Sequence, residues 1–535
     1  MKQYETVLFV VLFAAVLAAG AVFRLTALDK RPVHGDEANQ AVKTGRLLEK
    51  GEYRYDPKEH HGPTLYYMAL AALKTAGVKK FADSTITEYR VVPALCGIAM
   101  VALAGLLVLP LGRWAAFWAA LLTAVSHAMT YYSRYYIQEV LLVLFVYAAL
   151  GCAWRWWRKP GVGWALAAGA CLGLVHATKE TCVVIFAAMA LAKVLTLLYS
   201  RWRDGRWPAL FEEDSPAGRL FARALGVYLT ALVLAAVLVS VTFFSSFFTY
   251  WHGVADSVMA FTTYLHRGTE GAGSSALHDK PWYYYFSLLG WTYRSAGPKW
   301  SEAPVLALAA LGATVLLVRR GTGTEARSAV LGRFLVFLTL ILTAVFSLLA
   351  YKTPWNALIF FQGMILLAGV GAAALIRAGR WRPLQAVLCA VVLGLAGFEA
   401  RQAWQGNFVY AADARNPYAY AHTSTAVTRL ADRVHDLCAV DPAGKAMEVR
   451  VIQPGGDYWP LPWYFRDLTR VGYWSDIPPS PDAAPVIITA PQLAPRLQPL
   501  LKEPYFVETH GLRPGRLLTV FIRQDLWDRF MAGRS

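Results

Sequence analysis

The fold is decided near the N-terminus by TVLFVVLFAAVLAAGAVF, residues 6–23, a run without a single charged side chain. A helix that crosses the hydrocarbon core of a bilayer needs about 20 predominantly apolar residues. The run is longer than the apolar region of a secretory signal peptide, which spans roughly 7–15 residues, and no clear small-residue cleavage site follows it. We therefore expect this segment to be retained as a first membrane-spanning helix.

Similar apolar runs recur as far as residue 400. The chain is 56% hydrophobic and only 16% charged, which is more apolar than an ordinary soluble protein of 535 residues. The predicted fold class is therefore a polytopic α-helical membrane protein with about eleven transmembrane helices. Their expected spans are 5–27, 89–110, 114–131, 136–154, 163–178, 180–198, 222–247, 303–318, 333–350, 356–376 and 384–400.

The distribution of Lys and Arg predicts the orientation. Strict alternation of eleven helices places one group of basic loops on the same side as the N-terminus, and the positive-inside rule makes that side the cytoplasm. We expect an inner-membrane protein, and this rule explains much of the net charge of +17 without a nucleic-acid partner. The basic residues of these loops are Arg113, Arg155, Arg158, Lys159, Arg201, Arg203, Arg206, Arg219, Arg223, Arg319, Arg320, Arg327, Arg333, Arg377, Arg380 and Arg382.

Two modules are predicted along the chain. Residues 1–400 form the transmembrane module, with a first outer loop at 28–88 and a second large outer loop at 248–302. After residue 400, segments 448–453, 485–489, 505–509 and 516–522 are typical of strands, whereas 424–437 and 525–531 are typical of helices. Residues 401–535 are therefore expected to form an extracytoplasmic α/β domain.

The first motif of chemical interest is Asp36-Glu37, which follows the first helix. Adjacent carboxylates at a membrane surface are costly to desolvate, and one of them could serve as a general base for an acceptor hydroxyl. The alternative is an N-cap for a helix over 38–50. On spacing alone, the capping interpretation is slightly favoured.

The second motif is Glu59-His60-His61-Gly62-Pro63 in the same loop. His60 and His61 beside a carboxylate could bind a phosphate or a metal. Consecutive residues do not point in one direction, however, and Gly-Pro before an apolar helix is also an ordinary helix start.

The third motif lies between the predicted third and fourth helices and contains Arg134, Tyr135 and Glu139. Arg can hold a phosphate through two parallel hydrogen bonds. Glu139 is expected about one turn inside the membrane, where an unpaired carboxylate is unfavourable. The tyrosines of this segment are also typical of an interfacial aromatic belt.

Two further charged segments interrupt apolar sequence. Lys179 and Glu180 lie between predicted helices and could be either substrate-binding residues or a structural ion pair. Lys352 lies in a short outer loop, where a bound anion is a fair explanation for a lone cation. Trp355 and Asn356 follow it, although a tryptophan there could also be an interfacial anchor.

Alternation of the helices places all five motifs on the non-cytoplasmic side. A site with carboxylates, cations and aromatic rings at a membrane surface suits a substrate that has an apolar tail, a phosphate and a sugar. Motifs for other chemistries are absent, namely Walker A, GxGxxG, HExxH and Asp-x-Asp. The six cysteines show no CxxC spacing and are interpreted as packing residues.

The residues quoted above resemble motifs of the dolichyl-phosphate-mannose-protein mannosyltransferase superfamily. This superfamily comprises GT-C fold enzymes of glycosyltransferase family 39 and the related aminoarabinose transferases. Within it, the chain is most similar to the prokaryotic flippase-activity-associated proteins over residues 1–400. The matching segments are Asp36-Glu37, Ser133-Arg134 with Glu139, Thr178-Lys179 and Tyr351–Asn356, whereas His61-Gly62-Pro63 matches imperfectly and Glu180 replaces a frequent Gly.

The resemblance implies a polyprenyl-phosphate-sugar donor, inversion at the anomeric carbon and Asp36 as the base, with Glu37 beside it. It also implies that a metal is dispensable; if a divalent metal does bind, its ligands are expected among Asp36, Glu139 and His61. The acceptor would be a lipid, a glycan or a protein.

Two other functions compete with this interpretation. A lipid-linked-oligosaccharide flippase component or transporter would show charges near mid-membrane and inverted repeats, which this sequence lacks. A non-catalytic scaffold with an outer binding domain is the third hypothesis, and the sequence does not exclude it.

Overall fold

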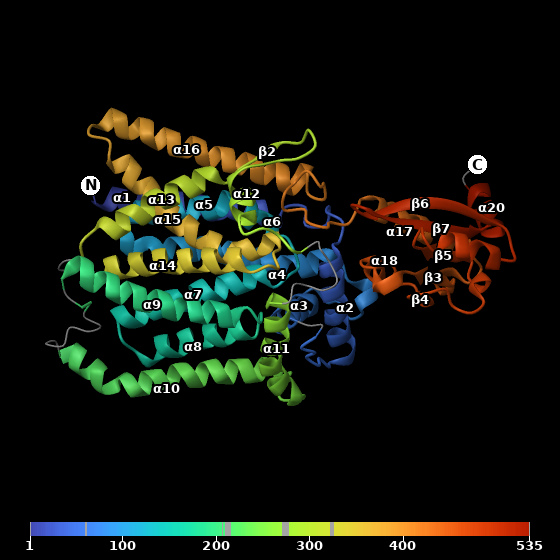
Figure 1. The fold of residues 1–535 in the computed structure, drawn as a ribbon, viewed down its shortest axis with the longest axis horizontal. Helices are drawn as coiled ribbons and strands as arrows, with labels where there is room; N and C mark the ends of the chain where they lie inside the picture. The colour runs from blue at the N-terminus through green and yellow to red at the C-terminus, as the bar shows by residue number, and fades with distance from the viewer. Residues whose placement is uncertain are drawn as a thin grey trace. The chain divides into compact units, whose positions relative to one another are not determined.

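The structure, a computed structural model, describes residues 2–58, 61–205, 207–208, 216–269, 278–321 and 326–533. These residues form two compact units (Figure 1). The first unit comprises Met1–Thr26, Glu52–Met68 and Arg90–Val409. The second comprises Ala27–Gly51, Ala69–Tyr89 and Tyr410–Ser535. The predicted division at residue 400 remains a prediction.

The first unit is a bundle of helices, several of which run side by side in Figure 1. Its long helices have mostly apolar side chains, as contact with lipid requires. The helical conformation also satisfies the backbone hydrogen bonds that lipid cannot. The helices are α1 (Lys2–Leu25), α4 (Ile86–Val108), α5 (Arg113–Val125), α6 (His127–Tyr132), α7 (Glu139–Arg158), α8 (Val162–His176), α9 (Cys182–Asp204), α10 (Pro216–Phe244), α11 (His252–Thr269), α12 (Tyr284–Gly290), α13 (Ala303–Val318), α14 (Ala326–Leu348), α15 (Leu358–Arg377) and α16 (Arg382–Trp404). Helix α3 (Thr64–Thr75) is shared between the two units, and the first residues of α4, up to Tyr89, also belong to the second unit.

Within the described residues, eight helices are long and apolar enough to cross a membrane. They are Tyr4–Leu25, Ile86–Leu111, Glu139–Arg158, Cys182–Asp204, Ala224–Phe244, Ala326–Leu348, Pro354–Arg377 and Arg382–Val409. Three shorter apolar helices, Arg113–Val125, Val162–His176 and Ala303–Val318, coincide with the other predicted spans. The polytopic helical fold class is thus confirmed, whereas the number eleven stays a prediction.

Three segments differ from their predicted form. The span expected over 114–131 is two helices, because Ser126 leaves the helical conformation and its hydroxyl accepts from Met129 N to begin α6. Arg333, expected in a loop, lies inside α14 and donates to both carboxylate oxygens of Asp204. The loop expected over 248–302 contains α11, α12 and a hairpin of β1 (Thr292–Tyr293) and β2 (Lys299–Trp300).

Small residues allow α13 and α15 to pack closely. A Cβ atom added at Gly312 would lie 1.9 Å from the carbonyl oxygen of Leu367, and one at Gly371 would lie 1.9 Å from that of Leu308. Close backbone approach through glycine is typical of helices packed within membranes. The pairing of α13 with α15 therefore depends on these glycines.

The second unit is built on a mixed five-stranded sheet in the order β4-β3-β5-β7-β6. Strand β3 pairs in parallel with β4 and β5, whereas β7 pairs antiparallel with β5 and β6. The strands are β3 (Val449–Ile452), β4 (Val471–Trp474), β5 (Val486–Thr489), β6 (Tyr505–Arg513) and β7 (Arg516–Arg523). The helices are α2 (Gly35–Lys50), α17 (Ala426–Val440), α18 (Leu461–Tyr464), α19 (Ala494–Leu497) and α20 (Gln524–Ala532).

Both faces of this sheet are covered, as alternation along β5 shows. Val486 and Ile488 pack with α17 and α20 on one face, and Ile487 packs with Leu497 of α19 on the other. The predicted C-terminal α/β fold is confirmed, with four of the five strands located in advance. The missed strand is β4, a short segment with a glycine whose residues are all only partly buried.

Candidate functional site

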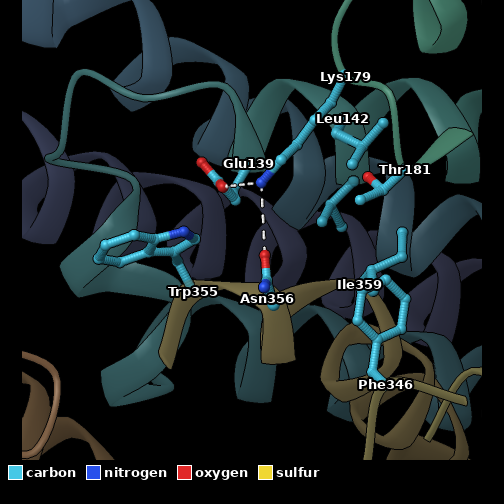
Figure 2. Close-up of a pocket in the computed structure, with 9 residues that line it drawn as sticks. Glu139, Leu142, Lys179, Thr181, Phe346, Trp355, Asn356 and Ile359 are labelled. Atoms are coloured by element: carbon cyan, nitrogen blue, oxygen red, sulfur yellow. Dashed lines mark hydrogen bonds and ion pairs between the residues drawn. The ribbon is translucent and has the colours of Figure 1, made fainter. Parts of the chain in front are cut away.

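A pocket lies where the start of α7, the connection from α8 to α9 and the start of α15 meet (Figure 2). Of the predicted site residues, the structure brings together four here: Glu139, Lys179, Trp355 and Asn356. Glu139 is the first residue of α7, a position where the helix dipole favours a carboxylate. The other lining residues are Leu142, Val143, Thr181, Phe346 and Ile359, which the sequence analysis did not single out.

Lys179 is the central polar group of this pocket. Its Nζ lies 2.5 Å from Oε1 of Glu139 and 3.4 Å from Oδ1 of Asn356. The Lys179 and Glu139 side chains are only 8% and 6% exposed, so the pair is largely desolvated. The second carboxylate oxygen of Glu139, Oε2, is buried and has no hydrogen-bond partner among the described residues.

The rest of the pocket wall is apolar. Leu142 and Val143 follow Glu139 on α7, and Ile359 lies at the start of α15, just after the 3-10 turn Pro354–Ala357 that contains Asn356. Phe346 comes from the last turn of α14. The pocket thus combines the Lys179–Glu139 ion pair and the Asn356 amide with a hydrocarbon surface.

Aromatic rings extend from the pocket toward the segment that contains Tyr135. The Tyr135 ring is buried, and its centroid lies 6.3 Å from that of Trp355. Tyr132 also packs against Trp355, at 6.1 Å. These rings lie inside the protein, so the predicted interfacial belt is wrong for these two tyrosines.

Glu180 takes part in a separate cluster. Its Oε2 lies 3.0 Å from Nδ1 of His61, and Tyr55 donates to its Oε1 at 3.4 Å. Lys179 and Glu180 are therefore not partners of each other in this structure, although they are neighbours in sequence. His60, another predicted site residue, lies outside the described residues.

Arg134 is placed at the C-terminal end of α1. Its guanidinium donates to the carbonyl oxygens of Phe23, Arg24 and Thr26 at 3.1, 3.3 and 2.6 Å. It also packs on the ring of Phe408, 4.8 Å from the centroid. A cation at a helix C-terminus satisfies carbonyl groups that the helix itself leaves unpaired. Arg134 therefore completes the end of α1, and it is not among the residues that line the pocket.

Lys352 is buried and donates to the backbone carbonyl oxygens of Lys280, at 2.9 Å, and of Leu349. Its backbone N–H donates to the carbonyl of His278. Burial lowers the pKa of Lys352, and the nearby Asp279 acts in the opposite direction. In this structure Lys352 holds two chain segments together, and it is not among the residues that line the pocket.

Asp36 and Glu37 belong to the second unit, where they begin α2. Glu37 is fully buried; its Oε2 accepts from the His34 backbone N–H at 3.0 Å, and its Oε1 lies 3.7 Å from Arg31. The Asp36 side chain is 50% exposed. The N-cap of α2 is His34 and neither predicted carboxylate, although Glu37 completes the cap by accepting from the His34 backbone N–H. The half-exposed carboxylate of Asp36 is accessible for chemistry.

The described residues contain no group of three or more His, Cys, Asp or Glu side chains that could hold a metal ion. Of the three candidate ligands, Glu139 is paired with Lys179 and His61 is paired with Glu180. These residues do not fit a metal centre.

Comparison with known proteins agrees with this architecture. Residues 64–252 match the model of the family described as dolichyl-phosphate-mannose-protein mannosyltransferase. This segment of the chain is similar to that family. It contains Arg134, Glu139 and Lys179, while Asp36 and Asn356 lie outside it. No curated protein matched the sequence.

Solved structures with the same fold cover nearly the whole chain. ArnT from Cupriavidus metallidurans bound to undecaprenyl phosphate is 14% identical, with a TM-score of 0.61 over 98% of this chain and 99% of that one. AglB, an oligosaccharyltransferase from Archaeoglobus fulgidus in complex with an inhibitory peptide and a dolichol-phosphate, is 11% identical, with a TM-score of 0.54 over 92% and 70%. The chain therefore has a GT-C fold and is a multi-pass membrane protein.

Proposed function

We propose that this protein is a membrane glycosyltransferase that moves a sugar from a polyprenyl-phosphate carrier to a lipid, glycan or protein acceptor. The observation that carries the proposal is the position of Lys179, whose desolvated ammonium faces a pocket with an apolar wall. The shared fold with ArnT, which was solved with undecaprenyl phosphate, supports a donor of this class.

The pocket chemistry suits departure of a lipid phosphate. The prenyl tail would contact Leu142, Val143 and Ile359, and a phosphate oxygen would replace Glu139 as the partner of Lys179. Negative charge grows on the phosphate as the bond to the anomeric carbon breaks, and a fixed cation stabilises that charge most strongly in a dry site. Asn356 would orient the ammonium.

Asp36 is proposed as the general base. It would take the proton of the acceptor hydroxyl as that oxygen attacks the anomeric carbon, with inversion of configuration. Its support is chemical: Asp36 is half exposed, whereas the neighbouring Glu37 is buried and bonded within the helix start. Tyr135 packs against Trp355 and is proposed to support the pocket wall. Arg134 and Lys352 are bonded to backbone carbonyl oxygens and are proposed to hold the surrounding segments in place.

The proposed location is the inner membrane, with the N-terminus in the cytoplasm and the sheet domain outside it. The Lys and Arg distribution of the loops supports this orientation. The flippase-associated subfamily remains a prediction from sequence motifs, as do the donor sugar and the acceptor.

The decisive experiment is turnover by the purified protein in detergent. Radiolabelled undecaprenyl-phosphate and dolichyl-phosphate sugars would be incubated with lipid, glycan and peptide acceptors. We expect donor consumption by the wild type and its loss in Asp36→Asn. Asp29→Asn is the matched control, because Asp29 is an exposed carboxylate of the same segment that pairs with the neighbouring Lys30.

Two outcomes would reverse these assignments. If the wild type consumes no donor but accelerates lipid movement in reconstituted vesicles, the flippase alternative replaces the transferase. If Asp36→Asn and Asp29→Asn are equally active, the base is another residue.

A further inference from the structure

The start of α2, which carries Asp36, is bonded to the C-terminal part of the same structural unit. The backbone N–H of Val33 donates to the hydroxyl of Tyr464 at 3.0 Å. A Cβ atom added at Gly35 would lie 3.4 Å from Cβ of Trp459, so the backbone there passes directly over that side chain. Tyr464 and Trp459, from the C-terminal part of the chain, are thus part of the local environment of Asp36.

His34 makes the most specific of these contacts. Its Nδ1 accepts from the backbone N–H of Asp36 at 3.0 Å, and its Nε2 lies 3.2 Å from the carbonyl oxygen of Tyr420. A carbonyl oxygen can only accept, so Nε2 carries the proton that it donates to Tyr420, and Nδ1 accepts from the Asp36 N–H. One neutral tautomer satisfies both bonds, and the C-terminal segment selects that tautomer.

The ring of His422 packs edge-on against His34, with centroids 5.5 Å apart. His422 is fully buried, and burial together with the nearby Arg31 holds its pKa well below the usual value for histidine. The neighbour of His34 is therefore a neutral ring that fixes its plane by packing.

We propose that His34 is a positioning residue for Asp36, and that residues 420–464 of the C-terminal domain are part of the catalytic apparatus through it. The inference rests on the proposed function in one respect, the role of Asp36 as base. Glu37 holds the helix start from one side and His34 from the other, which leaves the Asp36 carboxylate as the one acid of the motif directed to solvent. A base must be held in a fixed geometry, because displacement by about 1 Å can cost roughly 100-fold in rate.

The test separates capping from positioning. Asparagine is a favourable N-cap, so His34→Asn keeps the helix start but loses the bond to Tyr420. We expect kcat to fall about 10- to 100-fold, with the donor KM changed less than about twofold. His34→Gln, whose longer side chain can reach toward Tyr420, is expected to recover part of the loss.

A second variant tests the domain contact directly. Tyr464→Phe leaves the Val33 N–H without its acceptor and should lower kcat in the same way. Tyr505→Phe is the matched control: its hydroxyl donates to the carbonyl of Ala484 inside the C-terminal domain, away from α2. It should leave kcat unchanged even if it lowers the melting temperature.

Hydrogen exchange of the peptide spanning 33–40 gives a readout that needs no turnover. We expect faster exchange in His34→Asn and Tyr464→Phe than in the wild type and Tyr505→Phe. If exchange and kcat are unchanged in both variants, or if only KM changes, the positioning role is refuted. If exchange changes as expected but the wild type consumes no donor, the structural link holds and the proposed function fails.

Discussion

Lys179 and Glu139 form a desolvated ion pair with Nζ 2.5 Å from Oε1, and Oε2 of the same carboxylate has no partner in the described part of the chain. A buried ion pair is weak evidence for stability, because desolvation offsets most of the attraction. Its position on a pocket favours a role in binding, in which an anionic ligand exchanges with the carboxylate. Two predictions separate binding from stability.

The first prediction concerns Lys179→Met, which keeps the length of the side chain and removes its charge. A hydrogen bond to a charged group contributes about 1.5–3 kcal/mol, so kcat/KM for the lipid-phosphate donor should fall by roughly 10- to 150-fold. The matched control is Lys193→Met, because Lys193 lies further along α9 on an exposed face beside Trp157. Equal kinetics of the two variants would remove Lys179 from the site.

The second prediction concerns folding. Lys179→Met leaves Glu139 buried without its cation, and such a change typically destabilises a protein by about 3–5 kcal/mol. Adding Glu139→Gln should restore most of the thermal stability, because the remaining amide carries no charge, but it should not restore activity. Recovery of both properties together would mean that Lys179 is only structural.

The fold could be predicted to a large extent because membrane helices and buried strands have strong sequence signals. Residues 6–23 illustrate this, since nothing but a buried or lipid-facing helix satisfies such a run. The break at Ser126 was missed because the residues on both sides of it are also apolar. Its cause is a local cap, in which the hydroxyl competes for the helical backbone N–H of Met129.

The site was predictable only in part. Charged residues within apolar sequence indicated Glu139 and Lys179, which the structure places at one pocket, but this pattern gave no information on their partners. Lys352 and Arg134 are satisfied by backbone carbonyl groups, which carry no sequence signal. The partner of Glu180 is His61, more than one hundred residues away, and only the three-dimensional fold selects it over the adjacent lysine.

The third prediction tests the packing of the bundle. Gly312→Ala places a methyl group 1.9 Å from the carbonyl oxygen of Leu367, so α13 and α15 must separate. Overpacking of this kind typically costs about 1–3 kcal/mol, which thermal unfolding in detergent would detect. Gly394→Ala in α16 is the control, since nothing lies within 4 Å of its added Cβ atom. A stable Gly312→Ala variant would contradict the close contact between α13 and α15.

The fourth prediction concerns pH and His422. Because its pKa is lowered in the folded protein, the unfolded chain binds a proton more readily below the ordinary histidine pKa of about 6.5. The free energy of unfolding should therefore be unaffected by His422 above that pH and should decrease as the pH falls below it, by at most about 1.4 kcal/mol per pH unit. His422→Gln should flatten the dependence of stability on pH between about 6.5 and 5.

His435→Gln is the control, because His435 lies at a partly exposed position of α17 beside Asp467. If the wild type and His422→Gln lose stability in parallel over this range, the buried neutral state of His422 is wrong, and with it the packing against His34.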